Sequence, residues 1–175
     1  MLRLMEPNIE GILVNLLSKS LILFVFAVLA ACSASEAPKA QEGIALEVFK
    51  SPTCGCCGKW VTHLEESGFN TTVRNQNSLD SIKKKLGVPA NMQTCHTGVS
   101  ADGYFFEGHI PAKFITAFLA NPPENAAGLA VPGMPAGSPG MEMGDRFNPY
   151  SVILVKKDGT TEVYAEVASL EEQHQ

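Results

Sequence analysis

The chain has 175 residues, of which 45% are hydrophobic and 18% are charged, and its formal net charge is -5 at pH 7. This length predicts one globular domain with a short appendage rather than two full domains. The negative charge argues against nucleic acid as a partner, because a broad basic face would be needed to hold it. The apolar content is sufficient for a core, so the chain is expected to be neither disordered nor a multispan membrane protein.

Residues 1–31 are predicted to be an export signal rather than part of the fold. An unbroken apolar run from Leu21 to Ala31 follows Lys19. As a helix, this run would cross only about half of the roughly 30 Å hydrocarbon layer of a membrane. It ends in Leu-Ala-Ala-Cys, which resembles the cleavage box of bacterial lipoproteins, so Cys32 is predicted to become the lipidated first residue. An ordinary cleaved signal and an uncleaved anchor are the alternatives.

Composition sets the remaining domain boundaries. Residues 32–43 contain mostly Ala, Ser, Pro, Lys and Glu without a hydrophobic period, which is typical of a flexible tether. A single domain is predicted over residues 44–167, followed by a disordered tail over residues 168–175. The protein is therefore expected in the periplasm, anchored to the outer membrane through its lipid.

The pattern of apolar and turn residues predicts the order of the elements. They are a strand over 44–50, a helix over 57–67, a strand over 69–75, a helix over 79–86, a hairpin over 95–101 and 104–109, a helix over 110–119, and a second hairpin over 151–155 and 160–165. Residues 128–144, rich in Gly, Pro and Met, are predicted to be a connecting loop. The order of the first elements is that of a thioredoxin-like domain. The predicted fold is therefore α/β and thioredoxin-like, with an additional C-terminal β-hairpin.

Three cysteines lie at the predicted start of the first helix, in the sequence Cys54-Gly55-Cys56-Cys57. The positive end of a helix dipole favours the thiolate form, which is both the nucleophile and the soft metal ligand. Cys54 and Cys57 have the CxxC spacing of a redox disulfide, which leaves Cys56 without a role in a simple redox pair. A polynuclear site for monovalent copper would use such an additional thiol, because Cu(I) prefers sulfur and thiolates can bridge ions.

Cys95 and His96 form a second candidate pair at the start of the third predicted strand. In a thioredoxin-like arrangement this strand start faces the cysteine loop, at a position that commonly holds a cis proline, so Cys95 is predicted to face the loop from Cys54 to Cys57. Neighbouring strand residues point to opposite faces, so His96 can join Cys95 only where the strand is irregular. His109 ends the next predicted strand near the same rim, where a hydrogen bond at a helix entry is favoured and a ligand role is the alternative. His63 is predicted to point to a different helix face.

Three methionines lie in the predicted loop, and Met134 and Met141 are candidate copper ligands. Thioethers bind monovalent copper and resist the disulfide formation that disables thiols in an oxidising compartment. The alternative is that the loop is a turn-rich connector whose methionines fill apolar gaps.

Five segments together carry a family resemblance. TCGCCGKW, CHTGV, GYFFEGHIPA, GLAVPGMPAGSPGME and PYSVIL resemble the exported copper-resistance proteins of the CopG family, long catalogued as domain of unknown function 411, over about residues 45–165. The resemblance implies a thioredoxin-like fold, a CxCC copper site and a role in periplasmic copper handling. By that similarity Cys54, Cys56 and Cys57 fall on the CxCC motif, and Cys95 and His96 fall on a CH motif.

The expected function is therefore binding of monovalent copper in copper resistance, with a change of copper oxidation state as an additional activity. Copper ions and other periplasmic copper-handling proteins are the expected partners. A thiol-disulfide oxidoreductase using Cys54 and Cys57 is one alternative, disfavoured by the additional Cys56. An iron-sulfur carrier is another, since four thiolates permit a cluster. It is disfavoured because no twin-arginine signal for folded export precedes the apolar run.

Overall fold

The computed structural model describes residues 43–173, so the predicted signal, most of the tether and Cys32 lie outside the described residues. The described elements follow one another as β1 (Ile44–Lys50), α2 (Gly55–Glu66), β2 (Phe69–Asn75), α3 (Asp80–Leu86), η1 (Ala90–Met92), β3 (His96–Ser100), β4 (Phe105–Gly108), α4 (Ala112–Ala120), β5 (Ala126–Val131), β6 (Tyr150–Lys156), β7 (Thr161–Val167) and η2 (Glu171–Gln173). The predicted strands and helices are all present, with ends that differ by a few residues.

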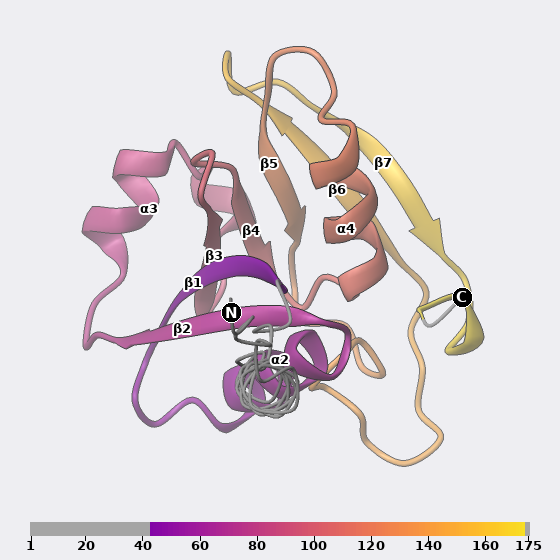
Figure 1. The fold of residues 1–175 in the computed structure, drawn as a ribbon. Helices are drawn as coiled ribbons and strands as arrows, with labels where there is room; N and C mark the ends of the chain where they lie inside the picture. The colour runs from indigo at the N-terminus through magenta and orange to yellow at the C-terminus, as the bar shows by residue number, and fades with distance from the viewer. Residues whose placement is uncertain (1–42, 174–175) are drawn as a thin grey trace, which may run out of the picture. The chain divides into compact units, whose positions relative to one another are not determined.

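The seven strands form one mixed sheet in the order β2-β1-β3-β4-β5-β6-β7 (Figure 1). Strands β1 and β2 are parallel and are connected through α2, and β4 and β5 are parallel and are connected through α4. The β1–β3, β3–β4, β5–β6 and β6–β7 pairs are antiparallel. The prediction of an α/β fold is confirmed, and the second hairpin extends the sheet as β6 and β7.

Two hydrophobic clusters lie on opposite faces of the sheet, because successive strand residues alternate in direction. Helices α2 and α4 pack on the first face, where Trp60, Leu64 and Phe118 are fully buried with Phe106 of β4. The second face is covered near α3 by a smaller cluster that includes Phe105, the neighbour of Phe106. The cysteines lie at the start of α2, on the first face.

Strand β5 differs from the sequence prediction, which assigned residues 128–144 to a loop. It is buried along most of its length, so its residues are almost all apolar. They lack the alternation of apolar and polar residues that would predict a strand. Gly128 also weakens the strand signal, but the position excludes any side chain: a Cβ there would lie 2.0 Å from the Phe105 carbonyl oxygen. Only the remainder of the predicted loop, after Val131, connects strands.

The C-terminal segment also differs from the expectation of a disordered tail over residues 168–175. Residues Glu171–Gln173 form a 3-10 helix, and Gln173 is buried. The Tyr150 hydroxyl donates to Gln173 Oε1 at 2.7 Å, and Gln173 Nε2 donates to the Gly137 carbonyl at 2.9 Å. The side chain is ordered by partners distant in sequence, which local composition does not reveal.

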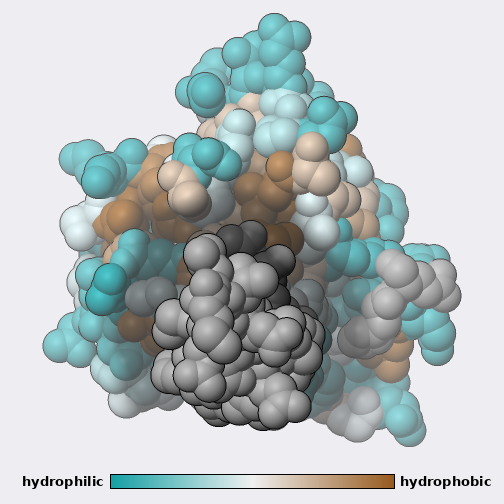
Figure 2. Space-filling view, in the orientation of Figure 1, coloured by the Kyte–Doolittle hydropathy of each residue, from teal (hydrophilic) through white to brown (hydrophobic). Residues whose placement is uncertain are grey.

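On the face shown in Figure 2, hydrophilic residues form most of the outline and hydrophobic residues gather toward the middle of the view. Among residues 43–173, no helix has the length and apolar character needed to cross a membrane.

Candidate metal centre

The CxCC segment connects β1 to α2 and forms the first turn of that helix. Cys54 is the N-cap residue, and its sulfur accepts a hydrogen bond from the Cys57 backbone N–H at 3.3 Å. This cap explains why α2 begins at Gly55, two residues before the predicted start, since a side-chain acceptor at the N-cap satisfies one free N–H group of the first turn. Capping directs the sulfur of Cys54 toward Cys57 at the positive end of the helix.

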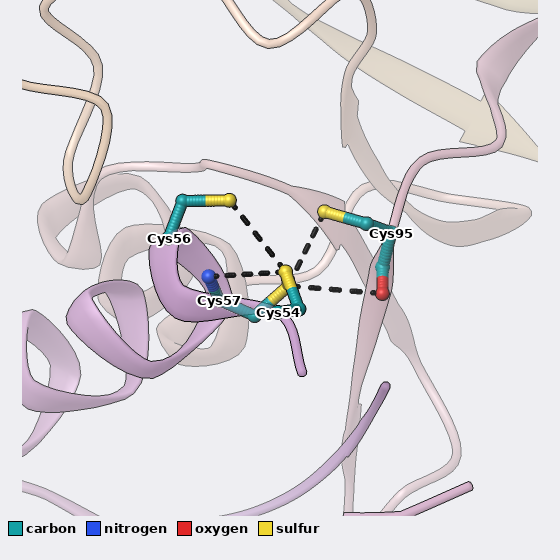
Figure 3. Close-up of side chains that lie close together, drawn as sticks. All are labelled: Cys54, Cys56, Cys57 and Cys95. Carbon is teal, nitrogen blue, oxygen red and sulfur yellow. Dashed lines mark hydrogen bonds between the residues drawn. A yellow bond between two sulfur atoms is a disulfide. The ribbon is translucent and has the colours of Figure 1, made fainter. Parts of the chain in front are cut away.

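Four sulfur atoms meet at this helix start (Figure 3). Cys54 and Cys57 are joined by a disulfide, while Cys56 and Cys95 are free thiols. Cys56 Sγ lies 3.5 Å from Cys54 Sγ, and Cys95 Sγ lies 3.2 Å from Cys57 Sγ, so each free thiol touches one sulfur of the disulfide. The four ligand atoms all lie within 4.8 Å of one another. We call this group the thiol cluster.

Cys95 reaches the thiol cluster because the chain around it is held by a buried carboxylate. Glu107 of β4 accepts hydrogen bonds from the Thr94 backbone N–H at 2.5 Å, from the Thr94 hydroxyl at 2.8 Å and from the Thr97 hydroxyl at 2.7 Å. Lys83 of α3 pairs with the same carboxylate at 2.5 Å and also donates to the Thr97 hydroxyl. The residues on both sides of the Cys95-His96 pair are thereby fixed on the face opposite to the cysteines.

His96 joins Cys95 because Cys95 precedes β3 rather than belonging to it. Strand alternation therefore does not separate the two side chains, and His96 Nδ1 lies 3.6 Å from Cys95 Sγ. The ring of His96 packs against Trp60, with 4.4 Å between the ring centroids. Trp60 is held in turn by the hydrogen bond from its Nε1 to the Ile110 carbonyl, at 2.8 Å.

His109 also lies at this site, near the rim where the sequence placed it. It is fully buried, and its ring stands edge-on to that of His96 with a centroid distance of 4.8 Å. Its Nδ1 contacts the Pro139 carbonyl at 2.8 Å. Cys95, His96 and His109 form a second group whose ligand atoms all lie within 4.8 Å of one another. The hydrogen bond at the start of α4 is instead made by His63, whose Nε2 accepts from the Ala112 N–H at 3.0 Å.

The Gly/Pro/Met loop lies over the helix start. At Gly140, where φ is +86°, a Cβ would lie 2.8 Å from both the Cys56 carbonyl oxygen and the Trp60 backbone nitrogen. Glycine is therefore required for the loop to approach α2 so closely. Met134 is 42% exposed, and its sulfur lies 3.8 Å from Cys95 Sγ. The backbone of Met141 forms hydrogen bonds with Gly137 and Ser138 in the adjoining turn. The methionine sulfur that contacts Cys95 is that of Met134.

The protonation states follow from burial. Burial first, and next the neighbouring Cys56, raise the pKa of the Cys95 thiol to about 11, so the metal-free thiol is protonated at neutral pH. Burial first, and next the charge of His109, lower the pKa of His96 to about 3. Burial also lowers the pKa of His109. Both imidazoles are therefore neutral at neutral pH, which is the form that binds metals.

The chain is similar to a known protein family and to solved structures. A family model described as "Protein of unknown function, DUF411" matches residues 92–141, which contain Cys95, both buried histidines, Met134 and Met141. Two solved structures of a protein called "Copper resistance protein copG", forms 1 and 2, are 45% and 44% identical to the chain, with TM-scores of 0.67 and 0.68. Each comparison covers 72% of this chain, and 98% and 99% of the respective solved chains. No curated protein sequence matches.

The chain belongs to the CopG family of copper-resistance proteins. The resemblance seen in the sequence is thereby confirmed. For this CopG-family chain the structure brings together Cys54, Cys56, Cys57, Cys95, His96 and Met134, while the backbone of Met141 lies in the adjoining turn.

Sequence reasoning missed the contact of His109 with the Pro139 carbonyl and the buried pair of Lys83 and Glu107. Lys83 is one of three consecutive lysines, and nothing in the sequence distinguishes it from its exposed neighbours. Glu107 gave a weak signal, because a charged residue two positions after Phe105 shares its buried face. His109 follows directly after β4, where neither helical nor strand periodicity assigns a direction.

Proposed function

We propose that this protein binds monovalent copper in periplasmic copper resistance, through a polynuclear site built by Cys54, Cys56, Cys57 and Cys95, with His96 and the loop methionines Met134 and Met141 as further ligands. The observation that carries the proposal is the convergence of four cysteine sulfurs within 4.8 Å. Thiolates select Cu(I) among available metals and can bridge neighbouring ions. The copper-resistance name of the similar solved structures supports copper as the cargo.

Copper loading in this proposal requires reduction of the Cys54–Cys57 disulfide, which occupies two of the four sulfurs. A dithiol reductant supplies two electrons and two protons, and each cysteine then releases its proton as copper binds. The disulfide form and the copper form are thus alternative states of the same site.

The same proposal includes a thioredoxin-like assignment for the first part of the sheet. The order β2-β1-β3-β4, with α2 after β1 and α4 after β4, supports it. So does the position of Cys95 opposite the CxCC loop.

Anaerobic titration of the fully reduced protein with Cu(I), followed by native mass spectrometry, tests the copper proposal. We expect more than one copper ion per chain, bound against a competing Cu(I) chelator, and a lower stoichiometry for Cys56→Ser. A stoichiometry of one that Cys56→Ser leaves unchanged would remove the reason for a polynuclear site. Absence of copper binding by the reduced protein would reject the proposal as a whole.

A thiol-disulfide oxidoreductase is a second candidate function, favoured by the disulfide at the N-terminus of α2. Helix N-termini stabilise the thiolate that such enzymes use. An insulin reduction assay separates the two functions, because the copper proposal expects little turnover and the oxidoreductase requires it.

We further propose that the mature protein begins at a lipidated Cys32 and faces the periplasm. The Leu-Ala-Ala-Cys sequence after the apolar run supports this. Globomycin, which blocks the lipoprotein signal peptidase, should cause the precursor to accumulate. If Cys32→Ser is processed and partitions into membranes as the parent does, the lipid anchor is excluded.

A further inference from the structure

Two buried histidines at the site each retain a ring nitrogen without a hydrogen-bond partner. His96 and His109 are fully buried, and the Nε2 atom of each is unpartnered. An unsatisfied buried polar atom costs about 1–3 kcal/mol, and most such atoms in folded proteins are paired. Two of them in rings whose centroids lie 4.8 Å apart require an explanation, and a ligand bound at this site would provide one.

The contact with Pro139 determines which nitrogen of His109 carries the proton. The Pro139 carbonyl oxygen can only accept a hydrogen bond, so His109 Nδ1 must be the donor across their 2.8 Å contact. In the neutral imidazole Nε2 then has a free lone pair and no hydrogen. Histidines that bind metals usually have this arrangement, in which the second ring nitrogen donates to a carbonyl and fixes the ring.

The His109 ring lies beside other donors. One ligand atom from each of Cys95, His96 and His109 can be chosen so that all three are within 4.8 Å of one another. His96 is oriented by Trp60 and His109 by Pro139, so both rings are fixed before any ligand arrives. Cys95 belongs to this group and to the thiol cluster, and it connects the two.

We propose that Cys95, His96 and His109 form a second copper subsite, distinct in donor type from the thiol cluster and joined to it by the Cys95 sulfur. The inference rests on the proposed copper function. One thiolate and two imidazoles are a good donor set for copper. Copper binding displaces the proton of the Cys95 thiol to solvent and leaves both histidines neutral.

The second subsite, unlike the thiol cluster, does not depend on the redox state of the Cys54–Cys57 disulfide. The Cys54–Cys57 disulfide removes two donors from the thiol cluster, whereas none of the three donors of the second subsite takes part in it. The second subsite is therefore complete in the oxidised chain. The disulfide form should retain one copper ion per chain, bound in part by nitrogen.

The test uses the disulfide form, titrated anaerobically with Cu(I) as its acetonitrile complex. Native mass spectrometry gives the stoichiometry, chelator competition gives the affinity, and X-ray absorption at the copper edge distinguishes nitrogen from sulfur neighbours. His109→Asn is the informative variant, because an amide can still donate to the Pro139 carbonyl while the Nε2 lone pair is lost. His63→Asn is the matched control, since His63 Nε2 is engaged with the Ala112 N–H. Circular dichroism establishes that each variant is folded.

We expect one copper ion with nitrogen neighbours in the parent disulfide form and in His63→Asn. In His109→Asn the affinity should fall at least about tenfold, because even the partners that orient metal ligands contribute that much. If the disulfide form binds no copper, or if His109→Asn binds copper as tightly as the parent does, the second subsite is refuted. Multiple copper ions in the reduced chain would then still support the thiol cluster, so the two proposals fail separately.

Discussion

Two polar clusters lie on opposite sides of the start of β3, and they differ in how completely their atoms are paired. On the α3 side, the Glu107 carboxylate accepts from Lys83, Thr94 and Thr97, and none of these side chains is left without a partner. On the α2 side, His96 and His109 keep unpartnered nitrogens next to free thiols. A fully satisfied buried network stabilises one conformation, whereas an unsatisfied one preserves donors for something that binds later.

The comparison predicts the largest effect where the satisfied network is broken. Glu107→Gln leaves the Lys83 ammonium buried without its counter-charge, and such changes cost about 3–5 kcal/mol of unfolding free energy. Urea unfolding of the metal-free protein measures this. Arg74→Gln is the control, because Arg74 and Glu47 form an exposed pair that contributes at most about 1 kcal/mol. Equal losses in the two variants would show that the buried network is no stronger than a surface pair.

On the unsatisfied side, substitutions should change copper binding rather than folding. Cys95→Ser removes the sulfur shared by both donor groups and should weaken Cu(I) binding at least about tenfold, equivalent to about 1.4 kcal/mol. Met134→Leu should have a smaller effect because a neutral thioether is the weaker donor. Anaerobic chelator competition on the reduced protein ranks the two. The opposite order, with Cys95→Ser binding as the parent does, would exclude Cys95 as a principal ligand.

The buried histidines predict how stability depends on pH. The pKa of His96 is about 3 in the folded chain and near 6.5 when exposed, and the pKa of His109 is shifted in the same direction. Below pH 6.5 the unfolded chain therefore binds more protons, so the unfolding free energy decreases, by up to about 1.4 kcal/mol per pH unit for each histidine. Urea unfolding of the metal-free parent and His96→Phe at pH 7 and pH 5 measures this. A decrease as steep in the variant as in the parent would exclude His96 as a source.

The smallest effect is expected when an unsatisfied atom is removed. His96→Phe retains a ring that can pack on Trp60 and eliminates the unpartnered Nε2. Replacement of such a group by an apolar one of similar shape is close to neutral, so the unfolding free energy at pH 7 should change by less than about 1 kcal/mol. Urea unfolding of the metal-free parent and of His96→Phe at pH 7 measures this difference. A loss as large as that of Glu107→Gln would mean that His96 has a structural hydrogen bond after all.

Much of this arrangement could be predicted from the sequence because it depends on local signals. The apolar alternation of β1, the helical spacing of Trp60 and Leu64, and the CxCC spacing are all contained in short segments. The position of Cys95 opposite the cysteines required an assumed fold, and the 3.2 Å contact with Cys57 agrees with it.

The remaining features depend on partners far apart in sequence. Strand β5 consists of small and apolar residues, and most of them are buried. The segments that bury them lie elsewhere in the sequence, so the segment alone does not reveal a strand. The role of His109 depends on Pro139, 30 residues later, and that of Lys83 on Glu107, 24 residues later. The order of the strands in the sheet brings these distant residues into contact, so only the folded structure shows the pairs.

Gln173 connects the C-terminal end of the described chain to the loop that lies over the thiol cluster. Its amide group holds the Gly137 carbonyl, and Gly137 lies between Met134 and the Gly140 contact with α2. A truncation that removes Gln173, or a bulky fusion directly after it, would release one attachment of this loop. Copper measurements on C-terminally tagged protein would then report on a loosened site, and a tag at the other end of the domain is the safer choice.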